Sequence, residues 1–370
     1  MSLIVSILGF GIIVMIHEFG HYILAKSLGV GVIEFSIGMG PRLFSFVKGE
    51  TRYSFRVLPF GGSCMMLGEE AAENGGSDGM ITVDGRSFSR DRQFANKPAW
   101  KRLAVILAGP FFNFILAFLL SLAVTGIGGW DRPVILAVTE GSPAQEAGLS
   151  AGDTVTMLEI RGRKTRVKTS GDIQLFFLAN GKLAEQGEEI GIRFKDVSGQ
   201  EQSRRVVLRY NEEEGRYLLG ISYSTVYEPC ENLGQLLEMS LHNLTFCLQN
   251  TVESLRMMIR GELNTSDVKG VVGIVAVMDE TMDEAYDYGF LSAALTFMNF
   301  MMLLSFSVGI MNLIPLPALD GGRIFFILIE MITGKGVPKK AEAIIHTIGF
   351  VILMGLMVLI LFNDVWNLIK

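Results

Sequence analysis

The sequence predicts a polytopic α-helical membrane protein with a β-rich domain inserted between its spans. Hydrophobic residues make up 49% of its 370 residues and charged residues only 19%, and the mean hydropathy is +0.40. This balance is typical of a chain that is partly solvated by lipid. Four apolar stretches reach the roughly 20 residues that a helix needs to cross a bilayer. They lie near 2–25, 103–127, 290–314 and 344–369.

The first apolar stretch has the position of a secretory signal peptide but not its composition. No basic residue precedes it, it stays apolar for too long, and it contains His17, Glu18 and His21. We therefore expect it to be retained as a span.

Basic residues in the loops predict the orientation of the chain. Lys and Arg are frequent between the first two spans, from Lys26 to Arg102, and again between the last two, from Arg323 to Lys340. Loops of this kind stay in the cytoplasm. Both termini and the long middle segment are therefore expected to be extracytoplasmic.

The middle segment is the most polar part of the chain. Short Val, Ile and Leu runs separated by Gly-rich turns predict a small β-rich domain. After it, Leu and Met recur at helical spacing from Leu236 to Ile259, which favours an amphipathic helix at the membrane interface. The predicted parts are a first half of the membrane core (1–130), the β-rich domain (131–225), an amphipathic linker region (226–289) and a second half of the core (290–370).

The sharpest motif is His17-Glu18-Phe19-Gly20-His21 in the first span. Residues four apart share one face of a helix, so both imidazoles can bind one metal ion. Glu18 starts about 100° around the helix, but its longer side chain reaches a water beside that ion. Zinc suits these residue types, because imidazole binds it well and an open position activates water. A chance cluster of polar residues is disfavoured, because ionisable groups at bilayer depth are costly.

Asp320 is the candidate for a third metal ligand, because His242 lies in the amphipathic stretch and His346 opens the last span. It belongs to Asn-Leu-Ile-Pro-Leu-Pro-Ala-Leu-Asp-Gly-Gly at 312–322, where prolines break the helix and glycines allow a tight turn. Irregular backbone at membrane depth requires surrounding protein or a water-filled cavity, and hydrolysis needs such a cavity. A solvated Asp in a membrane-edge turn is the alternative.

Two asparagines are weaker candidates. Asn312 is expected either to hydrogen-bond a substrate peptide or to cap backbone groups freed by the proline break. Asn113 follows Gly109-Pro110 in the second span and is expected to link helices rather than to act in catalysis.

Composition also argues against some partners. The net charge is -6 and no basic run with interleaved aromatics occurs, so nucleic acid is not an expected partner. The three cysteines form no C-x-x-C pair and are expected to be packing residues.

With these motifs in order, the chain resembles the site-2 proteases of the bacterial regulator-of-sigma type, which are intramembrane zinc metalloproteases. The resemblance covers nearly the whole chain and includes Pro59-Phe60-Gly61-Gly62 and the segment that ends in Leu-Asp-Gly-Gly. It implies that His17, His21 and Asp320 bind Zn²⁺, that Glu18 is the general base and that Asn312 contacts the substrate backbone. It also implies a multi-pass protein of the bacterial cell membrane that carries out regulated intramembrane proteolysis.

The resemblance further implies a membrane-associated β-hairpin, which we place at Arg52–Leu67 with a bend at Gly61-Gly62. A substrate span could pair with its edge as an added strand, or the hairpin could only pack. The run from Gly141 to Asp153 resembles a PDZ domain, which implies an extracytoplasmic peptide-binding module or size filter. One such domain is expected here, and some members carry two.

Three functions compete at this point. The first is an endopeptidase that cleaves single-span membrane substrates such as anti-sigma factors or signal-peptide remnants. The second is a membrane PDZ scaffold or chaperone with a non-catalytic metal site, which has no need for Glu18 and favours a fourth protein ligand. The third, a metal transporter, needs more intramembrane carboxylates or histidines than the spans contain. The ligand types favour zinc, but two histidines and one carboxylate also suit ferrous iron, and the resemblance favours zinc.

Overall fold

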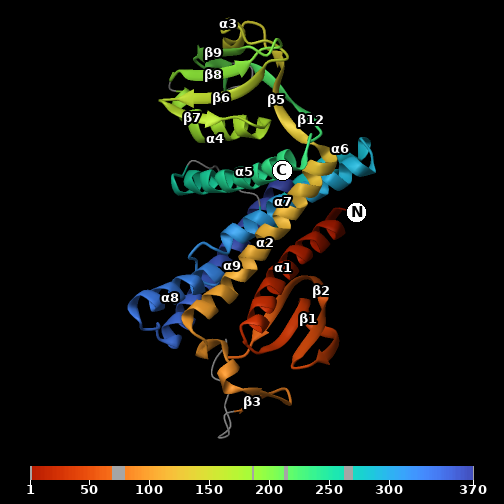
Figure 1. The fold of residues 1–370 in the computed structure, drawn as a ribbon, viewed down its shortest axis with the longest axis vertical. Helices are drawn as coiled ribbons and strands as arrows, with labels where there is room; N and C mark the ends of the chain where they lie inside the picture. The colour runs from red at the N-terminus through yellow and green to blue at the C-terminus, as the bar shows by residue number, and fades with distance from the viewer. Residues whose placement is uncertain (1, 69–79, 186, 212–215, 262–269, 370) are drawn as a thin grey trace. The chain divides into compact units, whose positions relative to one another are not determined.

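The computed structural model describes residues 2–68, 80–185, 187–211, 216–261 and 270–369. These divide into two compact units (Figure 1). The membrane unit comprises Met1–Leu120 and Leu263–Lys370, and the inserted unit comprises Ser121–Glu262. The predicted β-rich domain 131–225 lies within the inserted unit, apart from residues 186 and 212–215, which fall outside the described residues. Part of the predicted linker region, 262–269, falls outside them as well.

Within the described residues, four helices are long and apolar enough to cross a membrane, as the sequence predicts. They are α1 (Ser2–Ser27), α2 (Ala99–Gly128), α7 (Phe290–Met311) and α9 (Lys339–Ile369). The third ends three residues before the predicted limit, because Pro315 and Pro317 cannot continue a helix. In α9 only 6% of the apolar window is buried, so this helix depends on lipid to cover it.

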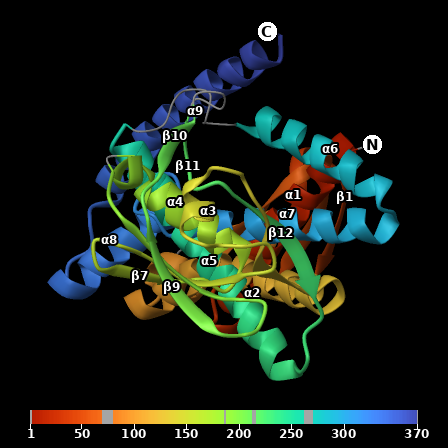
Figure 2. The same cartoon turned by 90° about the horizontal axis from the view of Figure 1, so that it is seen from above.

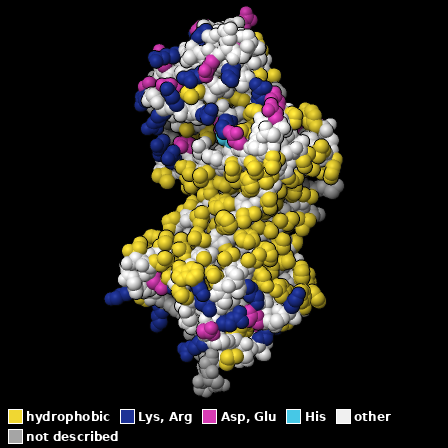
Figure 3. Space-filling view, viewed as in Figure 1, with side chains coloured by type: hydrophobic (Ala, Val, Ile, Leu, Met, Phe, Trp, Pro, Cys, Tyr) yellow, Lys and Arg dark blue, Asp and Glu magenta, His cyan; other side chains and the backbone are white. Residues whose placement is uncertain are grey.

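Apolar side chains cover the surface of these spans. Figure 3 shows them as a broad yellow area, with charged side chains gathered at the end of the membrane unit that carries β1 and β2. Phe111 is 59% exposed and Leu359 is 68% exposed. Exposed apolar surface of this extent needs a lipid solvent.

The segment after α1 forms a bent antiparallel pair, β1 (Val32–Lys48) and β2 (Thr51–Met66). Glu34 pairs with both Arg52 and Met65, so the first half of β1 lies between the two halves of β2. The predicted hairpin at Arg52–Leu67 is therefore wrong in detail. Its halves do not pair with each other, and the turn lies at residues 49–50, because both strands bend and fold back near Gly38 and Gly61.

A buried carboxylate holds this bent sheet together. Glu34 is 1% exposed and accepts hydrogen bonds from Arg56, at 2.8 Å, and from Arg42. Burial alone would raise the pKa of Glu34, but hydrogen bonds from the two guanidinium groups outweigh it and lower that pKa. The charge pairs link the first half of β1 to its own second half and to the first half of β2.

The rest of the membrane unit supports the spans. It contains β3 (Met80–Val83), β4 (Arg86–Ser89), two short 3-10 turns (Arg90–Arg92 and Phe94–Asn96), α6 (Val271–Asp287) and α8 (Asp320–Thr333). α6 lies beside α7 (Figure 2). Asp364 near the end of α9 accepts backbone hydrogen bonds from Gly270 and Gly273, each 3.0 Å long, at the start of α6.

The inserted unit is an antiparallel sheet with α4 (Ser170–Glu185) packed against it. Its strands lie in the order β12-β5-β6-β8-β9, and β7 also pairs with β6. Ile135, Leu158, Phe176 and Ile192 belong to its core. The strands are β5 (Trp130–Val138), β6 (Thr154–Ile160), β7 (Arg163–Arg166), β8 (Ile190–Lys195), β9 (Glu201–Val206) and β12 (Ile221–Glu228). α3 (Pro143–Glu146), α4 (Ser170–Glu185) and the pair β10 (Arg209–Asn211) and β11 (Arg216–Leu218) complete this part.

The predicted amphipathic helix is α5 (Leu233–Ile259). It begins three residues before the predicted start, because the side chain of Asn232 caps it by accepting from the N–H of Gln235. His242 on α5 contacts Asp172 on α4 at 3.0 Å, and Asn243 donates to Ser121 in the last third of α2.

Candidate active site

Two histidines of α1 project from one face of the helix, as their spacing predicts. His17 and His21 are 7% and 5% exposed. Their Nε2 atoms lie 3.2 Å apart, with the rings nearly perpendicular at 87°. Both nitrogens therefore point to the same place.

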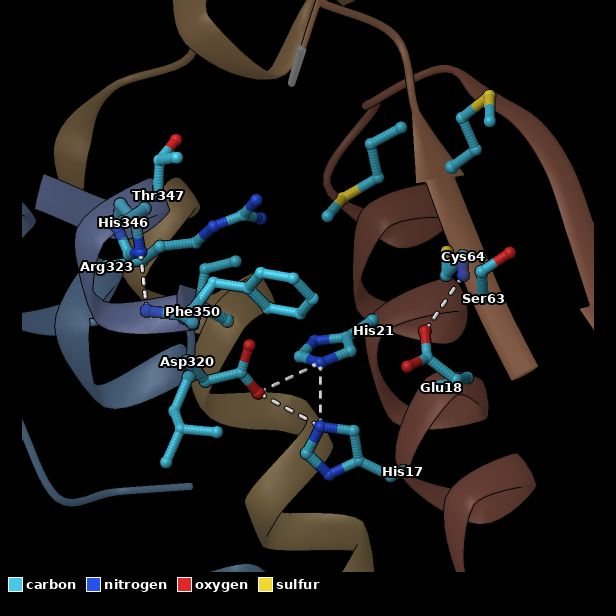
Figure 4. A pocket seen from close by; sticks show the side chains of 15 residues that line it. His17, Glu18, His21, Ser63, Cys64, Asp320, Arg323, His346, Thr347 and Phe350 are labelled. Carbon is cyan, nitrogen blue, oxygen red and sulfur yellow. Dashed lines mark hydrogen bonds and ion pairs between the residues drawn. The ribbon is translucent and has the colours of Figure 1, made fainter. Parts of the chain in front are cut away.

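Asp320 brings a carboxylate to this place from the other half of the chain. Its Oδ2 lies 3.0 Å from Nε2 of His17 and 3.1 Å from Nε2 of His21 (Figure 4). The chain leaves α7, crosses the two prolines and enters α8 at Asp320. Gly321 permits this turn, because a Cβ there would lie 1.9 Å from the carbonyl oxygen of Ile314.

These three atoms suit a metal ion. Nδ1 of His21 lies 2.9 Å from the carbonyl oxygen of Val105, which can only accept, so Nδ1 carries the proton and neutral His21 has a lone pair at Nε2. Oδ2 of Asp320 is buried without a hydrogen-bond donor. Lone pairs at such distances repel one another unless a cation lies between them. Zinc bonds of about 2.0–2.1 Å in a tetrahedral site place ligand atoms about 3.3 Å apart, close to the observed spacing.

Helix α2 leaves room for the imidazoles at Gly109. A Cβ at this position would lie 2.4 Å from Nε2 of His21 and 2.7 Å from Cε1 of His17. Any side chain larger than hydrogen would therefore occupy the space of the ligand atoms.

Glu18 is held beside the pair by the second half of β2. Its Oε2 accepts a hydrogen bond of 2.8 Å from the backbone N–H of Cys64 (Figure 4). Gly62 lies against the Glu18 side chain, where a Cβ would be 3.4 Å from its Cγ. The carboxylate is thus oriented by a backbone N–H of the edge strand, which is neutral and does not cancel its negative charge.

A cavity of about 550 Å³ joins these groups. Its walls come from α1, the end of β2, α2, the start of α8 with the loop before it, and α9. The residues that line it are His17, Glu18, His21, Ser63, Cys64, Met65, Met66, Ile106, Ala318, Leu319, Asp320, Arg323, His346, Thr347 and Phe350. A cavity of this volume has room for a metal ion together with several waters.

Comparison with known proteins decides the family. The family model described as peptidase family M50 matches residues 5–356. The chain belongs to peptidase family M50. One relative is a protein of Clostridium acetobutylicum, 35% identical over 316 residues, which are 85% of this chain and 83% of that protein. A relative in Clostridium perfringens is 34% identical over 85% of this chain and 84% of its own length. One in Fusobacterium nucleatum is 33% identical over 86% and 85%. All three carry the name "Putative zinc metalloprotease".

The M50 cavity contains a residue that sequence reasoning missed. Nδ1 of His346, on α9, accepts a hydrogen bond of 2.9 Å from the backbone N–H of Ala318. Ala318 has a φ of +74°, which is unfavourable for a residue with a Cβ. His346 therefore fixes the loop that delivers Asp320. The available signal was its rarity, since the chain has four histidines.

One residue that the sequence indicated, Asn312, is not among the described residues that line the cavity of the M50 site. Asn312 ends α7, where its backbone N–H donates to the carbonyl of Val308 at 3.0 Å. Its suggested contact with a substrate stays a prediction.

Proposed function

We propose that this M50 chain is an intramembrane zinc metalloendopeptidase of the site-2 type, acting on single-span membrane substrates. The observation that carries the proposal is the convergence of His17, His21 and Asp320 at 3.0–3.2 Å, with Glu18 beside them in the same cavity. These residues lie on or next to helices that are apolar enough to span a membrane.

The residues divide the chemistry between them. His17, His21 and Asp320 would hold the zinc. When bound, zinc lowers the pKa of a water to about 7 and polarises a peptide carbonyl. Glu18 takes the proton of the attacking water and returns it to the leaving amine. The N–H of Cys64 keeps the carboxylate oriented during both transfers.

The substrate must reach the site in an extended form, because the carbonyl groups of an intact helix are bonded and shielded. The second half of β2, Gly62–Met66, pairs on one side with β1, and Ser63 to Met66 line the cavity. A substrate strand that adds to the outer edge of this segment would place its backbone beside Glu18. The edge thus supports cleavage of a locally unwound span.

The inserted unit would act as an extracytoplasmic PDZ domain that selects substrates. The packing of α4 on a sheet with β12 at its edge supports this assignment. An extended peptide could add to β12. Substrates would be membrane segments already shortened outside, such as anti-sigma factor or signal-peptide remnants. We place the chain in a bacterial cell membrane, with both termini on the outer side.

The test is cleavage of a model single-span substrate by the purified chain in detergent. Glu18→Gln should abolish cleavage while zinc content stays unchanged, because Glu18 contributes no ligand atom. Asp320→Ala and a zinc chelator should abolish both cleavage and metal binding. If folded, zinc-loaded protein leaves several unrelated substrates intact, the activity is refuted and a PDZ scaffold with a non-catalytic metal site takes its place.

A further inference from the structure

Asn113 of α2 is buried against the metal site with half of its amide unused. The residue is 0% exposed, and its Nδ2 lies 3.3 Å from Nδ1 of His17. Its Oδ1 is buried and has no hydrogen-bond partner. A buried carbonyl oxygen without a hydrogen-bond donor costs about 1–3 kcal/mol. An apolar side chain would avoid this cost, so packing alone does not explain an asparagine at this position.

The orientation of this amide determines the tautomer of His17. If Nδ2 donates to Nδ1 of His17, a neutral imidazole must carry its proton on Nε2, the atom that faces Asp320, and it cannot bind a metal there. Rotation of the amide by about 180° exchanges two ends of nearly the same shape. Oδ1 then accepts from Nδ1–H, and the lone pair of His17 appears at Nε2.

His21 already has the second arrangement. Its Nδ1–H donates to the carbonyl oxygen of Val105. Val105, Gly109 and Asn113 are four residues apart and share one face of α2. Along this face, a backbone oxygen serves one histidine, a glycine makes room for both rings, and an amide lies against the other histidine.

We infer that Asn113 is a positioning residue for the metal, which accepts the Nδ1 proton of His17 and thereby directs the Nε2 lone pair to the ion. The inference rests on the proposed metal site. Histidines that bind zinc usually donate their other N–H to a carboxylate or carbonyl oxygen, and loss of that partner costs 10–100-fold in affinity. The alternative is that the amide only links helices.

Two substitutions separate these roles, because they change the acceptor in opposite ways. Asn113→Leu keeps the approximate volume and removes the oxygen, whereas Asn113→Asp replaces the amide by a group that can only accept. The contact of this position with α7 survives both, since Ser305 donates to the backbone oxygen of Asn113 at 2.9 Å.

The experiment measures the affinity of the full-length protein for zinc ion alone, by competition with a chelator in detergent. Asn113→Leu should weaken zinc binding by about 10–100-fold, and Asn113→Asp should stay within a few-fold of wild type. With cobalt in place of zinc, the visible spectrum of the Leu variant should change as well, since His17 is no longer held in the binding tautomer.

The opposite pattern, with tight zinc binding in Asn113→Leu and loss in Asn113→Asp, would show that His17 needs no acceptor at this position and would overturn the inference. Equal affinity in all three proteins would also overturn the inference. If the Leu variant does not fold, Asn113→Ala carries the same comparison. No substrate is needed, so a wild type that binds zinc but cleaves nothing refutes the protease and leaves this inference standing.

Discussion

Gly109→Ala adds a single methyl group to α2 and should abolish metal binding. The new Cβ would lie 2.4 Å from Nε2 of His21, whereas ordinary van der Waals contact begins at 3.4 Å. The ligand atom must therefore move by about 1 Å. Functional constellations tolerate about 0.5 Å, and a displacement of 1 Å can cost about 100-fold in rate. We expect zinc affinity and proteolysis to fall by at least about 100-fold.

A matched control exists on the same helix. At Gly126 a Cβ would meet only the Leu236 side chain, at 3.7 Å, so Gly126→Ala should bind zinc normally. Alanine is favoured over glycine in a helix by about 1 kcal/mol, so neither variant should lose helix stability. Zinc content after gel filtration and cleavage of a model substrate measure the difference. Normal zinc content in Gly109→Ala would refute the close approach of α2 to the histidines.

Substitutions at three further residues test contacts away from the ligands. His346→Leu leaves the N–H of Ala318 without an acceptor, so the melting temperature should fall by the equivalent of about 1–3 kcal/mol; His346→Asn should recover part of the loss. Asp364→Ala removes an acceptor of two backbone N–H groups at the start of α6 and should speed amide hydrogen exchange there, by about 1–2 kcal/mol of local stability. Burial would raise the pKa of Asp172, but hydrogen bonds from His242 and backbone N–H groups outweigh it and lower this pKa below 3.8. The ionised carboxylate therefore stabilises the folded protein by about 2 kcal/mol. This stabilisation is complete at higher pH and is lost as the pH falls below 3.8. Asp172→Asn should therefore flatten the decline in melting temperature between about pH 5 and pH 2, and an unchanged decline would contradict this assignment.

Much of the candidate site could be predicted from local rules. Helical spacing alone places His17 and His21 on one face. The prolines and glycines around Asp320 indicate a break in a span, and such a break at membrane depth is tolerated only where a cavity or protein surrounds it. The four spans follow from length and apolar composition. Each of these inferences uses residues that are close in the sequence.

The parts that sequence reasoning missed depend on contacts between distant segments. His346 acts through a backbone N–H 28 positions earlier, and no spacing rule connects the two. Gly109 matters because rings from another helix occupy the place of its Cβ. The pairing of β1 with both halves of β2 depends on a fold-back near Gly38, where a Cβ would lie 2.3 Å from the carbonyl oxygen of Leu58. Short-range periodicity contains none of this information.

The fourth span links the metal site to the thickness of the membrane. The candidate span Lys340–Asp364 has 25 residues and is about 38 Å long as a helix, against a hydrocarbon core of about 30 Å. A helix longer than the core tilts or bends to match it. Near the start of α9, His346 accepts a hydrogen bond from the loop that carries Asp320. Near its end, Asp364 accepts one from the start of α6. We therefore expect a change in lipid chain length to alter the tilt of α9 and, through His346, the position of the loop that carries Asp320.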